Sequence, residues 1–135
     1  INSKIFLVMN GDLICDMHHD ELIQCHIENN KPATIVLSHS KDAEDYGNIT
    51  LDKDNNIESF SEKTKKKLSN FVNAGTYIMD KDIFSLFPRN DTFSIEKDFF
   101  ERNPRKLNAH IIKGSFIDVG TPERFREVNK LTTSD

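Results

Sequence analysis

The stretch FLVMNGD, residues 6–12, guides the interpretation of the whole chain, because an apolar run breaks off there into asparagine, glycine and aspartate. Residues 4–9, KIFLVM, are typical of a strand buried on both faces of a parallel sheet. The three residues that follow have two interpretations. They form an ordinary turn, or they present Asp12 as a ligand at the end of a sheet.

The segments after this stretch continue the pattern of an α/β protein. Residues 16–30 are predicted to form a helix capped by Asp16 or Asp20. Its apolar face is expected to carry Leu22, Ile23 and Ile27. Residues 33–38, ATIVLS, read as a second buried strand. Strand, helix and strand in one sheet predict a parallel, right-handed crossover.

The second half of the chain alternates strands and helices. Residues 46–52 and 57–63 resemble a hairpin, and residues 71–80 a buried strand. Short helices are predicted at 81–87 and 94–103, and closing strands at 107–114 and 115–120. A last helix begins with Thr121 as N-cap and Pro122, and should turn Phe125, Val128 and Leu131 inward. The fold class is therefore α/β, a single domain over residues 1–135 with a mixed, mainly parallel sheet flanked by helices.

Composition limits the classes of function. Apolar residues make up 36% of the 135 residues and charged residues 30%, which is typical of a soluble globular protein. The net charge of −4 disfavours a general nucleic-acid binder, and no apolar run approaches the roughly 20 residues of a membrane helix. The isolated pair Cys15 and Cys25 favours reduced thiols and a cytoplasmic location.

Two aspartates stand where predicted strands end in glycine-containing turns. These are Asp12 in VMNGD and Asp118 in FIDVGTP. Each alone is more simply a turn residue or a cap. Together, on strand ends of one sheet, they could share a metal, since Mg²⁺ takes one or two carboxylates plus substrate phosphates. Asp16, His18 and His19 lack the spacing of zinc ligands and are expected to form a solvated helix start.

Six short motifs follow one another in a characteristic order: NGD, YGNI, FSEK, NAGTYIM, SIEKDFF and FIDVGTPERF. With them the chain resembles the sugar-1-phosphate nucleotidylyltransferases, especially compact bacterial members that activate heptose or mannose 1-phosphates with GTP. The resemblance implies a Rossmann-like nucleotidyltransferase fold. It also implies a Mg²⁺-dependent reaction in which a nucleoside triphosphate and a sugar 1-phosphate give a nucleotide-sugar and pyrophosphate.

The resemblance also implies roles for particular residues. Asp12 and Asp118 would be metal ligands, and Lys63 the cation on the sugar phosphate. The remaining substrate-binding positions would be Gly11, Gly47, Glu62, Asn73 and Gly75. Glu62 and Lys63 are alternatively an exposed ion pair, and Asn73 alternatively satisfies a buried strand end. Glu96 and Lys97 would lie beside the sugar pocket or form a helix-surface ion pair. His26 is expected to pack or cap rather than catalyse.

One part of the family pattern has no counterpart here. Members of the family carry an N-terminal glycine-rich loop that cradles the triphosphate, and the five glycines of this chain do not form it. The resemblance therefore implies the C-terminal portion of such a domain, inactive alone. We expect its uncovered sheet edge to self-associate or to receive a second chain. A non-catalytic binding module on the same fold is the alternative; a metal-dependent phosphohydrolase is less well supported.

Overall fold

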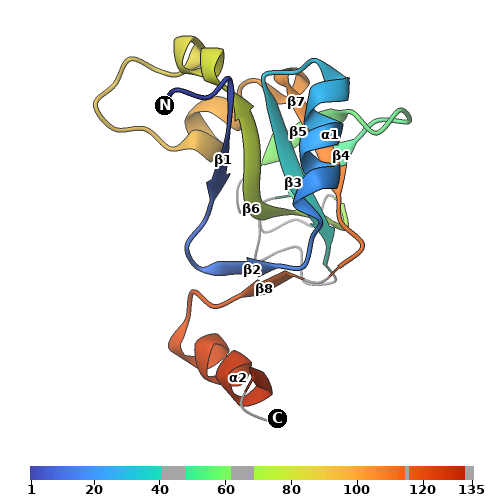
Figure 1. The fold of residues 1–135 in the computed structure, drawn as a ribbon, viewed down its shortest axis with the longest axis vertical. Coiled ribbons are helices and arrows are strands. Elements are labelled where there is room, and N and C mark those ends of the chain that lie inside the picture. Colours follow the sequence, from blue (N-terminus) through green and yellow to red (C-terminus); the bar gives the residue numbers. More distant parts are fainter. Residues whose placement is uncertain (41–47, 62–68, 115, 133–135) are drawn as a thin grey trace.

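Among the residues described by the structure, the fold consists of a six-stranded sheet, a small two-stranded sheet and two α-helices (Figure 1). A computed structural model describes residues 1–40, 48–61, 69–114 and 116–132. The strands are β1 (Ile5–Met9), β2 (Leu13–Cys15), β3 (Ala33–His39), β4 (Asn48–Leu51), β5 (Ile57–Ser61), β6 (Phe71–Asp80), β7 (Leu107–Ile111) and β8 (Phe116–Asp118). The helices are α1 (His19–Asn29) and α2 (Pro122–Thr132), with short helical segments at Lys81–Leu86, Ile95–Phe100 and Pro104–Lys106.

The large sheet is organised around β6. Its strand order is β5-β4-β6-β3-β7, and β1 also pairs with β6. β1, β3 and β4 all run antiparallel to β6, whereas β3 and β7 form a parallel pair. The predicted mixed α/β sheet is confirmed. β1, β3, β4 and β7 share one direction, but the opposed strand is central, so β1 and β3 are not the adjacent pair expected of a simple crossover.

Each face of the sheet has its own core, because successive side chains of a strand point to opposite faces. α1 lies across one face, where Leu22 packs with Val36 of β3 and Ile78 of β6 (Figure 1). The other face carries the larger cluster, in which Phe99 and Phe100 cover side chains that include Tyr77. The ring centroids of Tyr77 and Phe100 are 5.1 Å apart in an edge-to-face arrangement.

Several predicted details of packing are wrong. β1 is not buried on both faces: Leu7 is 43% and Met9 50% exposed. Among the described strands β1 pairs with β6 alone, so it lies at the edge of the sheet. The neighbours of a strand are set by topology, which an apolar run alone does not encode. In α2, Phe125 is 53% exposed rather than turned inward. The helix lies beyond β8, away from the large sheet (Figure 1).

α1 also differs from its prediction. Its N-cap is His18, which makes no capping hydrogen bond with its side chain, and Asp20 lies inside the first turn. The buried face consists of Leu22 and His26, four residues apart, while Ile23 and Ile27 are exposed. Nδ1 of His26 lies 2.9 Å from the Thr34 hydroxyl oxygen, which confirms a packing role for this histidine.

The small sheet was not predicted as such. β2 pairs antiparallel with β8, so that Leu13 lies opposite Asp118, although the two strands are about a hundred residues apart in sequence. This pair lies beyond one end of the large sheet (Figure 1). Among the residues that the structure describes, no helix has the length and apolar character needed to cross a membrane.

Candidate active site

Asp12 and Asp118 converge at the end of the small sheet. Asp12 directly precedes β2 and Asp118 is the last residue of β8. The backbone N–H of Val119 donates to the carbonyl oxygen of Asp12 at 2.8 Å, which extends the pairing beyond the strands. A methyl group on Gly120 would lie 3.0 Å from Oδ1 of Asp118 and 3.1 Å from Oδ2 of Asp12. Both carboxylates therefore border the same point above Gly120.

The Asp118 carboxylate is held on both oxygens. Oδ1 accepts a hydrogen bond from the Gly120 N–H at 2.8 Å, and Oδ2 accepts one from Nη1 of Arg124 at 2.5 Å. Arg124 lies in the first turn of α2, where its backbone N–H donates to the Thr121 hydroxyl oxygen at 3.3 Å. The predicted cap of α2 is thus confirmed, and it places a cation beside one of the two aspartates.

Gly75 connects this acidic end to the large sheet. Its carbonyl oxygen accepts the N–H of Asn10 at 2.8 Å, and its φ of 65° lies in the left-handed region. A methyl group here would lie 2.2 Å from Cδ1 of Leu13. Glycine is required at this position, where the β3–β6 register shifts and β6 passes beneath the turn that carries Asp12.

A line of hydrogen bonds leads from Gly75 to Glu96. Oδ1 of Asn73 accepts the Gly75 N–H at 2.9 Å, and Nδ2 of Asn73 donates to the Tyr77 hydroxyl oxygen at 2.7 Å. The Tyr77 hydroxyl then donates to Oε1 of Glu96 at 3.2 Å. The other oxygen of Glu96, Oε2, accepts from the Ser94 hydroxyl at 3.2 Å. An amide and a carboxylate from separate elements are thereby joined.

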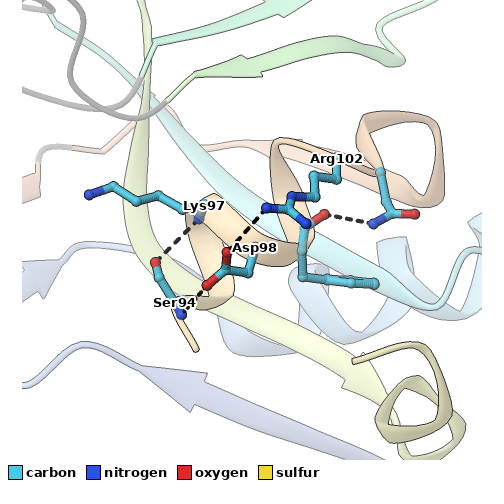
Figure 2. A network of polar contacts seen from close by, with 6 residues as sticks. Ser94, Lys97, Asp98 and Arg102 are labelled. Atoms are coloured by element: carbon cyan, nitrogen blue, oxygen red, sulfur yellow. Dashed lines mark hydrogen bonds and ion pairs between the residues drawn. The ribbon is translucent and has the colours of Figure 1, made fainter. Parts of the chain in front are cut away.

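The helical segment that carries Glu96 is fixed at its start by side chains (Figure 2). The Ser94 N–H donates to Oδ2 of Asp98 at 2.8 Å, and the Ser94 hydroxyl oxygen accepts the Lys97 N–H at 3.2 Å. Asp98 also lies 3.6 Å from Nη2 of Arg102. This reciprocal capping arrangement satisfies backbone donors at the start of the segment and sets the direction in which Glu96 leaves it.

The structure brings together part of the predicted site. Asp12 meets Asp118, while Asn73, Gly75 and Glu96 form one hydrogen-bonded group next to the turn that carries Asp12. Asn73 also satisfies the backbone of β6, as the alternative interpretation had it. Gly11 stands in the turn before β2, and a methyl group there would meet no atom of the described part of the chain within 4 Å. Gly47, Glu62 and Lys63 lie outside the described residues.

Sequence reasoning missed two participants, Tyr77 and Arg124. Tyr77 lies inside the NAGTYIM motif, four residues after Asn73, but its bond to Glu96 joins distant segments. Arg124 lies six residues after Asp118, and the sequence does contain a helix start between them that could have indicated the contact. Cys15, which points to the Ala74 carbonyl, has its thiol pKa raised by burial, which makes it a poor nucleophile.

The chemistry of the donors suits a hard divalent cation. In the part of the chain that the structure describes, no group of three or more histidine, cysteine, aspartate or glutamate side chains could hold a metal. Two converging carboxylates nevertheless match Mg²⁺, which takes few protein oxygens and completes its shell with water and substrate phosphates. In such a site, water or a phosphate ligand would supply the remaining oxygens.

Comparison with known proteins identifies the class to which this fold and site belong. The family model described as nucleotidyl transferase matches residues 1–135, and the chain belongs to this family. The resemblance inferred from the six motifs is thereby confirmed.

Two curated relatives are similar to this chain over most of its length. The chain is 33% identical over 126 residues to the mannose-1-phosphate guanylyltransferase catalytic subunit beta of Drosophila melanogaster, covering 92% of this chain and 34% of that protein. It is 35% identical over 123 residues to the mannose-1-phosphate guanyltransferase of Yarrowia lipolytica, covering 89% of this chain and 34% of that protein. The chain thus spans about a third of the length of these curated relatives.

Solved structures share the fold. HddC from Yersinia pseudotuberculosis superposes with a TM-score of 0.81 at 29% identity, covering 98% of this chain and 57% of that one. A second crystal structure of HddC is complexed with GMP-PN. A putative glucose-1-phosphate thymidylyltransferase from Bacillus anthracis superposes with a TM-score of 0.83 at 19% identity, covering 99% of this chain and 56% of that one, which supports the fold alone.

Proposed function

We propose that this chain supplies the metal-binding and sugar-phosphate-binding portion of a nucleotidyltransferase that joins a nucleoside triphosphate to a sugar 1-phosphate. The observation that carries the proposal is the meeting of Asp12 and Asp118 over Gly120, next to the group formed by Gly75, Asn73 and Glu96. A pair of carboxylates for a metal and a paired amide and carboxylate for hydroxyls are the two kinds of site that this reaction needs.

In the proposed reaction, an oxygen of the sugar phosphate forms a bond to the α-phosphorus of the triphosphate. The bond from the α-phosphorus to the bridging oxygen breaks, and pyrophosphate leaves with that electron pair. Asp12 and Asp118 would hold Mg²⁺, which supplies positive charge beside the phosphate oxygens. Gly11 would leave room for phosphates near Asp12, since no atom of the described residues lies within 4 Å of where its Cβ would stand. Lys63 would bind the sugar phosphate as its cation.

The sugar ring would contact the group on β6 and on the segment Ile95–Phe100. Glu96 would accept hydrogen bonds from ring hydroxyls, as would Glu62, while Asn73 would donate through its amide. The backbones of Gly47 and Gly75 would complete the pocket. Mannose or heptose 1-phosphate with GTP is the first substrate pair to examine, since curated relatives carry the name mannose-1-phosphate guanylyltransferase. A cytoplasmic location accords with the two free cysteines.

The proposal includes association through the edge formed by β1. Leu7 and Met9 are exposed on this strand, and an apolar cavity of about 180 Å³ separates it from α1, with Ile5, Leu22 and Ile23 in its lining. An unpaired strand edge with apolar side chains invites pairing with another chain. A second copy or a chain carrying a glycine-rich nucleotide loop would cover it.

The test is pyrophosphate release with Mg²⁺, the four common nucleoside triphosphates and a panel of hexose and heptose 1-phosphates. The assay compares the 135-residue chain with the product of the complete reading frame. Turnover by the longer protein alone is the expected result, and the active pair names the product. Absence of turnover in both, with sugar 1-phosphate still bound in calorimetry, would favour the non-catalytic binding module instead.

A further inference from the structure

The direction of every hydrogen bond between Gly75 and Glu96 is determined by the chemistry of its ends. The Gly75 backbone N–H can only donate, so the atom of Asn73 that faces it is the acceptor Oδ1. Nδ2 of Asn73 therefore faces Tyr77, whose hydroxyl oxygen must accept. The Tyr77 proton is then directed to the Glu96 carboxylate, which as an anion only accepts.

Glu96 is fixed in the same way from its other side. The Lys97 backbone N–H donates to the Ser94 hydroxyl oxygen, and this directs the Ser94 proton to Oε2 of Glu96. Two hydroxyl donors from different elements thus converge on one carboxylate. Each oxygen has a second lone-pair position, and the Asn73 amide carries a second N–H, so the group retains capacity for a ligand.

Tyr77 joins the two halves of this hydrogen-bonded group, which are Asn73 with Gly75 on β6 and Glu96 with Ser94. Tyr77 is fully buried, and its ring packs edge to face against Phe100. Its hydroxyl accepts a hydrogen bond from Asn73 and donates one to Glu96. A phenol held this rigidly sets the separation between an amide donor on β6 and a carboxylate acceptor on the segment Ile95–Phe100. Without the hydroxyl, each partner keeps its own anchor but loses its fixed position relative to the other.

We propose that Tyr77 is a positioning residue for sugar recognition. It holds Asn73 and Glu96 as a matched donor and acceptor for two hydroxyls of the sugar 1-phosphate, without touching the substrate. This inference rests on the proposed function. It predicts that the hydroxyl of Tyr77 matters for the sugar ring and not for the phosphates or the nucleotide.

The decisive variant is Tyr77→Phe, which keeps the buried ring and removes one oxygen. In the product of the complete reading frame, we expect the KM for the sugar 1-phosphate to rise about tenfold, the effect of losing a well-placed hydrogen bond. The KM for the nucleoside triphosphate and kcat should stay within about twofold of the parent values. A purely structural role would instead reduce the active fraction, lowering kcat and leaving both KM values unchanged.

Thr34→Val is the matched control, because it removes another buried hydroxyl, on β3, that contacts His26 of α1 rather than this group. It should leave the KM for the sugar 1-phosphate unchanged. A second measurement follows the side-chain amide signals of Asn73 by NMR, which should shift in Tyr77→Phe and not in Thr34→Val.

The outcomes separate the two proposals. A parent protein that neither binds nor converts any sugar 1-phosphate would overturn the proposed function, and the assignment of Tyr77 to sugar recognition with it. A parent protein that converts a sugar 1-phosphate, with an unchanged KM in Tyr77→Phe, would overturn the assignment of Tyr77 alone. Unshifted Asn73 signals in Tyr77→Phe would also overturn it.

Discussion

Arg124 forms an ion pair with Asp118, the aspartate whose carboxylate also borders Asp12 above Gly120. Nη1 of Arg124 lies 2.5 Å from Oδ2, and the guanidinium is less buried than the carboxylate it contacts. A cation from the chain therefore already neutralises part of the negative charge that a divalent metal would meet. A metal ion at this site and Arg124 would both bind the carboxylate of Asp118.

Removal of this guanidinium should strengthen metal binding in the absence of substrate. For Arg124→Gln we expect a severalfold tighter Mg²⁺ or Mn²⁺ titration by calorimetry, since the site loses a repulsive charge. Arg102→Gln is the control, because Arg102 is exposed and pairs with Asp98 rather than with Asp12 or Asp118, so its removal should leave metal affinity unchanged. Weaker metal binding in Arg124→Gln would mean that Arg124 orients Asp118 for the metal rather than competing with it.

The two aspartates should be required for turnover. Asp12→Asn and Asp118→Asn each keep the size of the side chain and remove its charge, and each should lower kcat by about a hundredfold or more. The assay is pyrophosphate release in the product of the complete reading frame. Asp91→Asn, at an exposed position, serves as the control. Near-normal activity in Asp118→Asn would remove this residue from the mechanism.

Gly75 and Gly11 should differ sharply in their tolerance of a methyl group. Gly75→Ala places a side chain at positive φ and 2.2 Å from Cδ1 of Leu13, which must move aside, so the free energy of unfolding should fall by about 1–3 kcal/mol. The methyl group of Gly11→Ala meets none of the described residues within 4 Å, so this variant should leave stability unchanged. Urea denaturation of both variants measures the difference. Equal stability of the two would contradict the tight passage of β6 beneath Asn10 and Leu13.

Stability should fall as the pH is lowered, with His110 contributing. Burial lowers the pKa of His110, and the negative charge of Glu21 opposes this in part. The unfolded chain therefore takes up the proton first, so the contribution of His110 is complete above its ordinary pKa and is lost as the pH falls through the lowered value. Between about pH 7 and about pH 5, the Tm of His110→Gln should fall less than the Tm of the parent protein. His19→Gln, at an exposed position, should follow the parent curve.

The β1 edge should mediate association. Sedimentation velocity of the 135-residue chain should show concentration-dependent oligomers, and Leu7→Lys together with Met9→Lys should shift them toward monomer by placing charge along the edge. Ile27→Lys changes an exposed apolar residue of α1 instead and should leave association as it is. A chain that stays monomeric at every concentration would exclude self-association through β1.

The sequence predicted those elements that local chemistry determines. The strand 71–80 and the start of the last helix appear where expected, and the hairpin turn is held by Asp52, whose Oδ1 accepts the N–H groups of Asp54 and Asn56 at 2.9 Å. The lowered pKa of Asp52 has its largest cause in the hydrogen bond from Asn56. Caps and turns depend on residues a few positions apart, so they can be recognised in a sequence.

Features that depend on distant partners could not be predicted in this way. β2 is three residues long, too short for a periodic signal, and its partner β8 is about a hundred residues away. The exposure of β1 and of Phe125 likewise depends on what packs against them. At the site, the two aspartates stand out as strand-end residues, but the contact of Tyr77 with Glu96 arises only when β6 meets the segment Ile95–Phe100.

The central position of β6 has a consequence for the order in which the chain becomes structured during translation. β1 and β3 leave the ribosome before β6, yet they cannot pair with each other, because the strand between them is made only at Phe71–Asp80. Until then, the backbone groups of β1 and β3 that bond to β6 lack their native partners, although α1 can already pack on Val36 of β3. Unpaired strands of this kind are prone to misassociation. Synthesis of β6 therefore marks the point at which β1 and β3 can join one sheet, to which β7 is added later.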